Sequence, residues 1–338
     1  MSVWLEGFYV PPLVTSAPAV APFAGAINNP NTTLLLGNGQ LADERRSGLR
    51  LRGGYWLNNC YALQFEYFGT QNSNESYNFA SAPGAFVFRP FFNTNPAVNA
   101  QDGELADTIG VSASSSFHSA SAHLRKCLQC CCDPCSDTCS RLDGFVGYRH
   151  ISLDENLTIG ETASVPPNTA IAIRDEFDTE NQFHGIEFGL HAKRRKGPWG
   201  LDCIARLAVG NNRETVRVAG AGVVNTPPAA PLQQPGGLLG QPTNIGKFKN
   251  DAFTIIPGVE LAVSRCLCPN LRARVGYTVM YVSDVVRPGR QIDFAVDGRW
   301  LDPNFVPPGA PPATRPARRF VESSLWVQAL NIGLEYSF

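Results

Sequence analysis

Apolar and polar side chains alternate with a period of two along most of this chain, most clearly near its C-terminal end. There one face consists of Trp326, Leu330, Ile332, Leu334, Tyr336 and Phe338, with Gln328 as its one polar member. The opposite face consists of Val327, Ala329, Asn331, Gly333, Glu335 and Ser337. Successive side chains of a β-strand point to opposite sides, so the pattern predicts a strand with one apolar face.

The same alternation recurs at residues 49–57, 61–68, 253–264 and 271–281, and in weaker form at 3–10, 111–125, 142–151, 183–193 and 199–210. Residues 86–92 could form a further strand. We therefore expect an all-β protein with about ten antiparallel strands, within a range of roughly eight to twelve.

Long and short connections alternate between these segments. The expected long loops cover 11–46, 70–110, 154–181, 211–250 and 284–321, and the short turns include Asn58-Asn59 and a Cys-rich turn at 126–140. Long loops on one rim and short turns on the other are typical of outer-membrane barrels. The sequence thus predicts one domain, residues 1–338, folded as a transmembrane up-and-down β-barrel with both termini on the turn side.

Composition narrows the class of protein further. Lys plus Arg number 28 and Asp plus Glu 29, which argues against a general nucleic-acid surface. No run of side chains approaches the ~18 apolar residues of a transmembrane helix, but a barrel strand needs only ~9–11 residues. No signal-peptide pattern follows Met1, so we expect an exported protein to appear here without its leader.

Strand parity places a set of charged side chains on the predicted interior face. The acidic members are Glu6, Glu66, Asp143, Glu187, Asp202, Glu260 and Glu335, and the basic ones are Arg50, Arg52, Arg125, Arg149, Lys193, Arg206, Arg272 and Arg274. The two signs nearly balance, which favours an ion-pair ladder that fills a narrow lumen. A selective pore lined by opposed charges is the alternative. We expect Arg272 and Arg274 to pair with Glu260 and Glu335.

The ten cysteines gather near the short turns. Nine are candidates for disulfides or for a metal site: Cys60, Cys127, Cys130, Cys131, Cys132, Cys135, Cys139, Cys266 and Cys268. An oxidising compartment favours disulfides, whereas the C-x2-C and C-x3-C spacings could hold zinc. Cys60 should lie close enough to join the 127–139 group, and Cys266 and Cys268 should not. Cys203 shares the parity of Leu201, which predicts a thiol facing lipid.

Catalytic and other metal-binding patterns are weak. The histidines His118, His123, His150, His184 and His191 are scattered, and no spacing singles out a triad. A Ser–His hydrogen bond near the outer lipid boundary would favour a barrel-wall hydrolase. The acidic stretch 175–180 could bind Ca²⁺, although a solvated acidic loop is the simpler interpretation. No cofactor is expected.

Several short segments together resemble a known family. They are Arg46–Leu51 leading into Gly54–Leu57, Arg89–Asn93, Arg141–Asp143 with Gly147–Arg149, Phe183–Gly185, Gly236–Leu239, Asn244–Gly246, Val286–Gly289 with Gln291–Asp293, and Leu330–Tyr336. Over nearly the whole chain the sequence resembles a planctomycete family of outer-membrane proteins described as putative beta-barrel porins, number seven. The resemblance implies a barrel and an outer-membrane location, and it transfers no catalytic residue.

These observations predict a bacterial outer-membrane β-barrel protein with a structural or interaction role and a lumen filled by side chains. A narrow porin-like channel for small solutes is the first alternative, and a barrel-wall hydrolase is the second. The expected partners are outer-membrane lipid, the outer-membrane insertion machinery and, through the long loops, an envelope or surface partner. Phe338 is the candidate assembly signal. No nucleic-acid partner is expected, and oligomeric state is not predicted.

Overall fold

The computed structural model of the chain describes residues 1–18, 25–58, 60–95, 98–133, 138–300 and 312–337. Its main sheet has 12 strands, paired antiparallel. They are β1 (Ser2–Leu5), β6 (Arg45–Trp56), β7 (Tyr61–Thr70), β8 (Ser73–Ala80), β11 (Thr108–Asp133), β12 (Thr138–Val165), β13 (Thr169–Lys196), β14 (Trp199–Asn225), β15 (Leu232–Gln234), β16 (Gly246–Cys268), β17 (Leu271–Val286) and β19 (Glu322–Tyr336).

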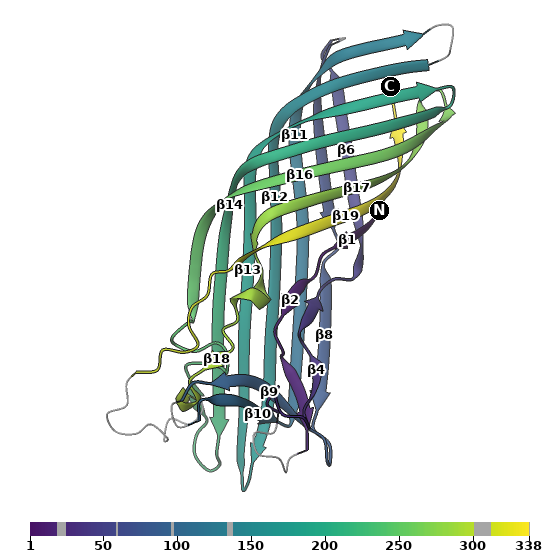
Figure 1. Cartoon of the computed structure of the whole chain (residues 1–338). Coiled ribbons are helices and arrows are strands. Elements are labelled where there is room, and N and C mark those ends of the chain that lie inside the picture. The colour runs from purple at the N-terminus through teal and green to yellow at the C-terminus, as the bar shows by residue number, and fades with distance from the viewer. Residues whose placement is uncertain (19–24, 59, 96–97, 134–137, 301–311, 338) are drawn as a thin grey trace.

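Strand pairing follows a cyclic order within this sheet. It runs β11-β12-β13-β14-β16-β17-β19-β1-β6-β7, and β7 pairs with β11 again. We call these strands the ring. The sheet has 12 strands rather than about ten because β8 extends the edge of β11 beyond β7, and β15 adds a short strand to β14. Figure 1 shows the ring with the C-terminus at its upper end, which we call the turn end.

Side chains of the ring alternate between an inward buried face and an outward face. In β16, Thr254, Ile256 and Glu260 are buried, whereas Phe253 and Ile255 are exposed. Apolar side chains remain exposed on the outward face of the neighbouring strands as well. This apolar band includes Leu49, Leu51, Tyr55, Leu63, Phe65, Tyr67, Leu124, Val146, Tyr148, Ile186, Phe188, Leu190, Leu201, Phe253, Ile255, Val259, Leu261, Val263, Val275, Tyr277, Trp326, Leu330, Ile332, Leu334 and Tyr336.

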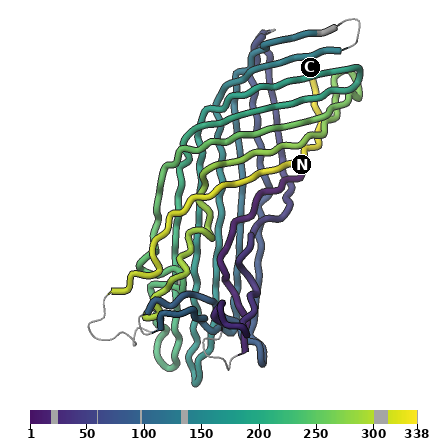
Figure 2. The backbone as a smooth tube through the Cα atoms, in the orientation of Figure 1, coloured from purple at the N-terminus to yellow at the C-terminus, as the bar shows by residue number. Residues whose placement is uncertain are grey.

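Five strands continue far beyond the apolar band, contrary to expectation. The predicted loop 154–181 is mostly β12 and β13, and much of 211–250 is β14 and β16. The predicted turn 126–140 is likewise mostly strand, since β11 ends at Asp133 and β12 begins at Thr138. Figure 2 shows these strands tilted near the turn end and more upright in the half of the molecule away from that end, which we call the far half. Beyond the apolar band the outward side chains of these strands are polar. These parts of the strands therefore lack the alternation of apolar and polar residues from which the sequence predicts strands.

The other predicted loops fold inward instead of remaining free. β9 (Phe86–Asn93), β10 (Ala100–Ala106), β3 (Val14–Ala17), β4 (Thr33–Leu36) and β18 (Ala295–Val296) form a second sheet, which we call the inner sheet. β2 (Phe8–Val10) pairs with β5 (Gly39–Leu41), and two 3₁₀ turns, η1 (Pro288–Gln291) and η2 (Gly298–Trp300), lie in the segment before β19. Figure 1 shows β9, β10 and β18 at the end opposite the C-terminus.

An apolar core joins the inner sheet to the long strands. Val87 and Phe91 of β9 belong to one buried cluster with Ile109, Leu157 and Phe177 on the inward face of the ring strands. In the far half the apolar face therefore points inward, whereas in the apolar band it points outward. Among the described residues, no helix is long and apolar enough to cross a membrane.

Candidate functional site: the filled lumen

A buried ion-pair network crosses the lumen at the level of the apolar band. Arg50 Nη2 lies 2.6 Å from Glu66 Oε1 and 2.6 Å from Glu260 Oε2. Arg52 Nη2 lies 2.9 Å from Glu66 Oε2 and 2.9 Å from Glu260 Oε2. The two carboxylate side chains are only 5% and 2% exposed. Both arginines extend from β6 to carboxylates on β7 and β16, so the network connects opposite walls of the ring.

Further arginines surround the same carboxylates. Arg274 Nη2 lies 2.7 Å from Glu260 Oε1, and Arg206 reaches both Glu66 and Glu260 at 3.4 Å. Arg149 pairs with Glu187, whose Oε1 lies 2.8 Å from His123 Nε2. The network holds five arginines and three glutamates, namely Arg50, Arg52, Arg149, Arg206 and Arg274 with Glu66, Glu187 and Glu260. The sequence predicted nearly equal numbers of positive and negative side chains, whereas in this network the arginines outnumber the glutamates.

A second group of charges lies closer to the turn end. Asp143 pairs with Arg125 and with Arg141, whose Nε lies 2.7 Å from Asp143 Oδ1. Asp202 Oδ1 lies 3.0 Å from His191 Nε2 and 3.6 Å from Lys193 Nζ. Parity alone could have found the three missed members, because Arg141, His123 and His191 share the inward face with Asp143, Arg125 and Lys193.

Three of the predicted lumen charges depart from expectation. Glu335 lies opposite Arg272 in register, but its carboxylate pairs with Lys193 at 3.8 Å. Among the described residues Arg272 has no ion pair, and its Nε and Nη2 have no hydrogen-bond partner. Glu6 was wrongly placed in the lumen. Because β1 ends at Leu5, which takes the inward position, Glu6 instead accepts a hydrogen bond from the Trp326 backbone N–H at 3.0 Å.

A layer of buried apolar side chains lies inside the ring, beyond the ion-pair network. Nine of the ring strands contribute to it, and its members are at most 9% exposed: Val3, Leu5, Phe68, Phe117, Ile151, Leu153, Phe183, Ala208, Ile256, Met280, Val282, Val285, Leu325, Val327 and Ala329. A void of about 30 Å³ lies between this layer and the network, bounded by Arg50, Arg149, Arg206 and Met280 among others. Such a void has room for about one water molecule.

Buried arginines attach the inner segments to the wall in the far half. Arg89 of β9 donates to Asp175 on β13 at 2.5 Å, and its Nε lies 3.4 Å from Glu161 on β12. Asp175 also accepts three backbone N–H bonds, at 3.2, 3.2 and 2.7 Å, from residues 238–240. Arg287 binds Glu155 at 2.6 Å in the same manner. The acidic stretch 175–180 is therefore strand rather than a solvated loop, with Asp175 buried inside.

We call the contacts of Arg89 with Asp175 and Glu161 the anchor. Burial in this anchor raises the pKa of Glu161 to about 8, since little solvent reaches its carboxyl group. An unfolded Glu ionises near 4.5, so the folded state holds the extra proton between these two values. The contribution of Glu161 to stability is then greatest below pH 4.5 and falls as pH rises toward 8, by up to about 1.4 kcal/mol per pH unit. We expect Glu161→Gln to reduce the pH slope of the free energy of unfolding by this amount in denaturant titrations at a series of pH values. An unchanged slope would contradict the assignment.

Three histidines lie on the outward face beside the apolar band. The Tyr67 hydroxyl lies 3.0 Å from His118 Nδ1, and the Tyr148 hydroxyl lies 2.5 Å from His184 Nδ1. His150 Nδ1 lies 3.0 Å from the Phe183 carbonyl oxygen. Within the described part of the chain, these histidines thus contact tyrosines and a carbonyl rather than serine hydroxyl groups.

The cysteines lie at the turn end as expected, but mostly as thiols. The Cys127 N–H donates to the Cys60 carbonyl at 2.7 Å, which confirms that these two residues are neighbours. Seven cysteines are free: Cys60, Cys127, Cys130, Cys131, Cys203, Cys266 and Cys268. A disulfide cluster that includes them is therefore not found.

The remaining three cysteines are less fully described. Cys139 is disulfide-bonded. Cys135 and the Cys132 side chain lie outside the described residues. No group of three or more metal-binding side chains was found within the described portion of the chain.

The model of one protein family, described as Putative beta barrel porin-7, matches residues 1–338. The chain belongs to this family. No curated protein matches it. One solved structure, OmpT from Vibrio cholerae, an outer membrane protein in its trimer form, aligns over 98% of this chain and 99% of that chain at 10% identity, with a TM-score of 0.10. That score is too low to support an inference about the fold.

Membership of the beta barrel porin-7 family agrees with the resemblance found in the sequence. It fits an all-β chain with antiparallel sheets and an outward apolar band. The planctomycete origin stays a prediction.

Proposed function

We propose that this protein is a bacterial outer-membrane β-barrel whose lumen is closed by its own side chains, with a structural or interaction role in the envelope. The observation that carries the proposal is the apolar layer, because side chains from nine ring strands meet across the lumen with little exposure. Water and ions would have to cross this layer and then the apolar core around the inner sheet. Both steps disfavour conduction.

The apolar band supports the membrane part of the proposal. An exposed apolar surface of this extent needs an apolar environment, and outer-membrane barrels place such a band against lipid. Trp199 and Tyr336 lie toward its turn end, and Tyr148 and Trp326 toward its other edge, as interfacial aromatic side chains would. On this proposal the cyclic pairing is a closed barrel, its partners are lipid and the insertion machinery, and the polar far half lies outside the membrane. The candidate assembly signal, Phe338, lies outside the described residues.

A channel gated by a removable plug is the second candidate, and the inner sheet is the observation that favours it. Its four antiparallel strands and β18 lie inside the far half rather than outside. The buried bonds of Arg89 and Arg287 to the wall argue for a fixed plug instead. We propose no enzymatic role, since the outward histidines bond to tyrosines and a carbonyl.

Planar-bilayer conductance tests the proposal. We expect wild-type protein to insert without stepwise increases in current, since on this proposal the apolar layer leaves no continuous path for water. Flotation with phosphatidylcholine vesicles would verify insertion, and a general porin would verify the bilayers. Frequent steps in untreated wild-type protein would refute the closed lumen. Steps that appear only in moderate urea would support the plugged channel.

A further inference from the structure

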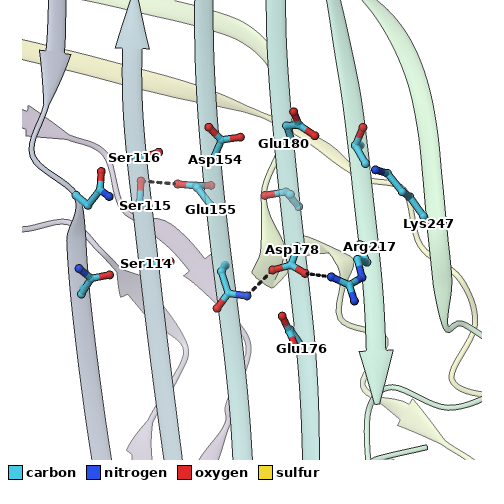
Figure 3. Close-up of a pocket in the computed structure, with 15 residues that line it drawn as sticks. Ser114, Ser115, Ser116, Asp154, Glu155, Glu176, Asp178, Glu180, Arg217 and Lys247 are labelled. Carbon is cyan, nitrogen blue, oxygen red and sulfur yellow. Dashed lines mark hydrogen bonds and ion pairs between the residues drawn. The ribbon is translucent and has the colours of Figure 1, made fainter. Parts of the chain in front are cut away.

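The outward face beyond the apolar band is divided into an acidic and a basic half. Asp154 of β12 and Glu176 and Glu180 of β13 lie on one side of a groove of about 480 Å³. Arg217 of β14 and Lys247 of β16 lie on the other side. Figure 3 shows the carboxylates on neighbouring strands, with Arg217 and Lys247 together beyond them.

Four cations make up the basic half, and we call them the basic patch: Arg213, Arg217, Lys247 and Lys249. Arg217 lies opposite Lys247 in the β14–β16 register. Two like charges opposite each other on adjacent strands destabilise a sheet unless an anion lies between them. The patch is thus a place where the fold leaves positive charge unbalanced.

Partners within the protein neutralise the basic patch only in part. Arg217 lies 3.6 Å from Asp178, and Arg213 lies 3.9 Å from Asp251, with arginine side chains that are 58% and 64% exposed. Such exposed, long ion pairs contribute little. No ion pair reaches the exposed Lys247 or Lys249 from any residue that the structure describes. These two lysines are therefore free to bind an external anion.

The basic patch adjoins the apolar band directly. Along β16 the outward positions run Lys247, Lys249, Asp251, and then Phe253 and Ile255 of the band. This order matches a lipid whose acyl chains lie against the apolar band and whose anionic groups lie against the basic patch. We propose that the basic patch binds the phosphate groups of a phosphorylated glycolipid in the outer leaflet. The inference rests on the proposed membrane insertion.

The length of the basic patch along the strands favours a glycolipid over a simple phospholipid. From the Arg213–Asp251 pair to the Arg217–Lys247 pair is four residues, or about 13 Å along the strands. A phospholipid headgroup layer is only about 5–8 Å thick on each side of a bilayer. A phosphorylated sugar headgroup extends further and can reach both pairs. Asp154 and Glu180 would repel the same anion, which restricts it to the β14–β16 side.

Native mass spectrometry of the full chain can measure this binding. Protein in mixed micelles would receive phosphatidylcholine with lipopolysaccharide carrying core phosphates, or with phosphatidylglycerol. We expect wild-type protein to retain lipopolysaccharide preferentially. Lys247→Gln/Lys249→Gln should reduce that retention about thirtyfold, given a contribution of about 1 kcal/mol from each lysine near a charged lipid surface. Lys247→Arg/Lys249→Arg keeps the charge and should retain lipid like the wild type.

Arg174, which lies on β13 and opposite a residue four positions beyond Arg217, is 63% exposed and provides a matched control outside the basic patch. Arg174→Gln should leave retention unchanged. Equal retention by the lysine-to-glutamine variant would overturn the inference, as would equal retention of phosphatidylglycerol and lipopolysaccharide by wild-type protein. Flotation with phosphatidylcholine vesicles separates the two proposals. Protein that floats without preferring lipopolysaccharide contradicts only the basic-patch inference, whereas protein that fails to float contradicts the barrel itself.

Discussion

Replacing Glu260 with glutamine should lower the free energy of unfolding by about 3–5 kcal/mol, the usual cost of removing one partner from a buried ion pair. Its carboxylate lies within 2.6–2.9 Å of Arg50, Arg52 and Arg274. The same network already holds five arginines against three glutamates. Without Glu260 only two carboxylates would remain to stabilise them. Urea unfolding in vesicles, followed by tryptophan fluorescence, measures the effect.

Glu335→Gln provides the matched control for this measurement. Its side chain is 31% exposed and its one ion pair, to Lys193, is 3.8 Å long. We expect a loss below about 1 kcal/mol, as for other solvated pairs. The sequence alone pointed to both Glu260 and Glu335 as partners of Arg272 and Arg274, and in the structure Glu260 pairs with Arg274 whereas Glu335 pairs with Lys193. Equal losses for the two variants would show that the network stabilises the ring less than its geometry indicates.

The sequence was informative wherever the local pattern reflects the environment of each face. Within the band, nearly every second residue of β16 and β19 is apolar because that face points outward, so parity alone separated band from lumen. Parity also identified Arg50, Glu66 and Glu260 as inward. It could not assign partners, since Arg50 and Glu260 are 210 residues apart and meet only when the ring is formed.

The far half was harder to predict because the same strands change character along their length. β13 carries Phe188 and Leu190 outward near the turn end, yet Asp175 and Phe177 are inward in the far half. The polar outward residues of that half resemble a loop in composition, which explains the incorrect range 154–181. The inner sheet was missed for a related reason. Residues 86–92 were recognised as a possible strand, but nothing local indicates that they would lie inside the ring.

Asp175 is the position in the far half where one substitution should have the largest effect. Its carboxylate accepts from Arg89 at 2.5 Å and from three backbone N–H groups of residues 238–240, and it is fully buried. Asp175→Ala would leave a buried guanidinium and three buried donors without their acceptor. We expect a loss of about 3–5 kcal/mol from the ion pair alone, with a further cost for the unpaired N–H groups.

The loss should be local, because the ion-pair network and the apolar layer are separate from this anchor. Limited proteolysis should therefore cleave Asp175→Ala protein within the inner sheet and residues 235–245 at concentrations that leave the ring strands intact. Asp178→Asn is the matched control, since Asp178 lies on the same strand but faces outward, where it pairs with the exposed Arg217 and accepts a hydrogen bond from Asn156. Its cleavage pattern should equal that of the wild type. If Asp175→Ala resisted protease equally well, the inner sheet would be held by its apolar core, and the Arg89–Asp175 bond would not be the attachment that fixes it to the wall.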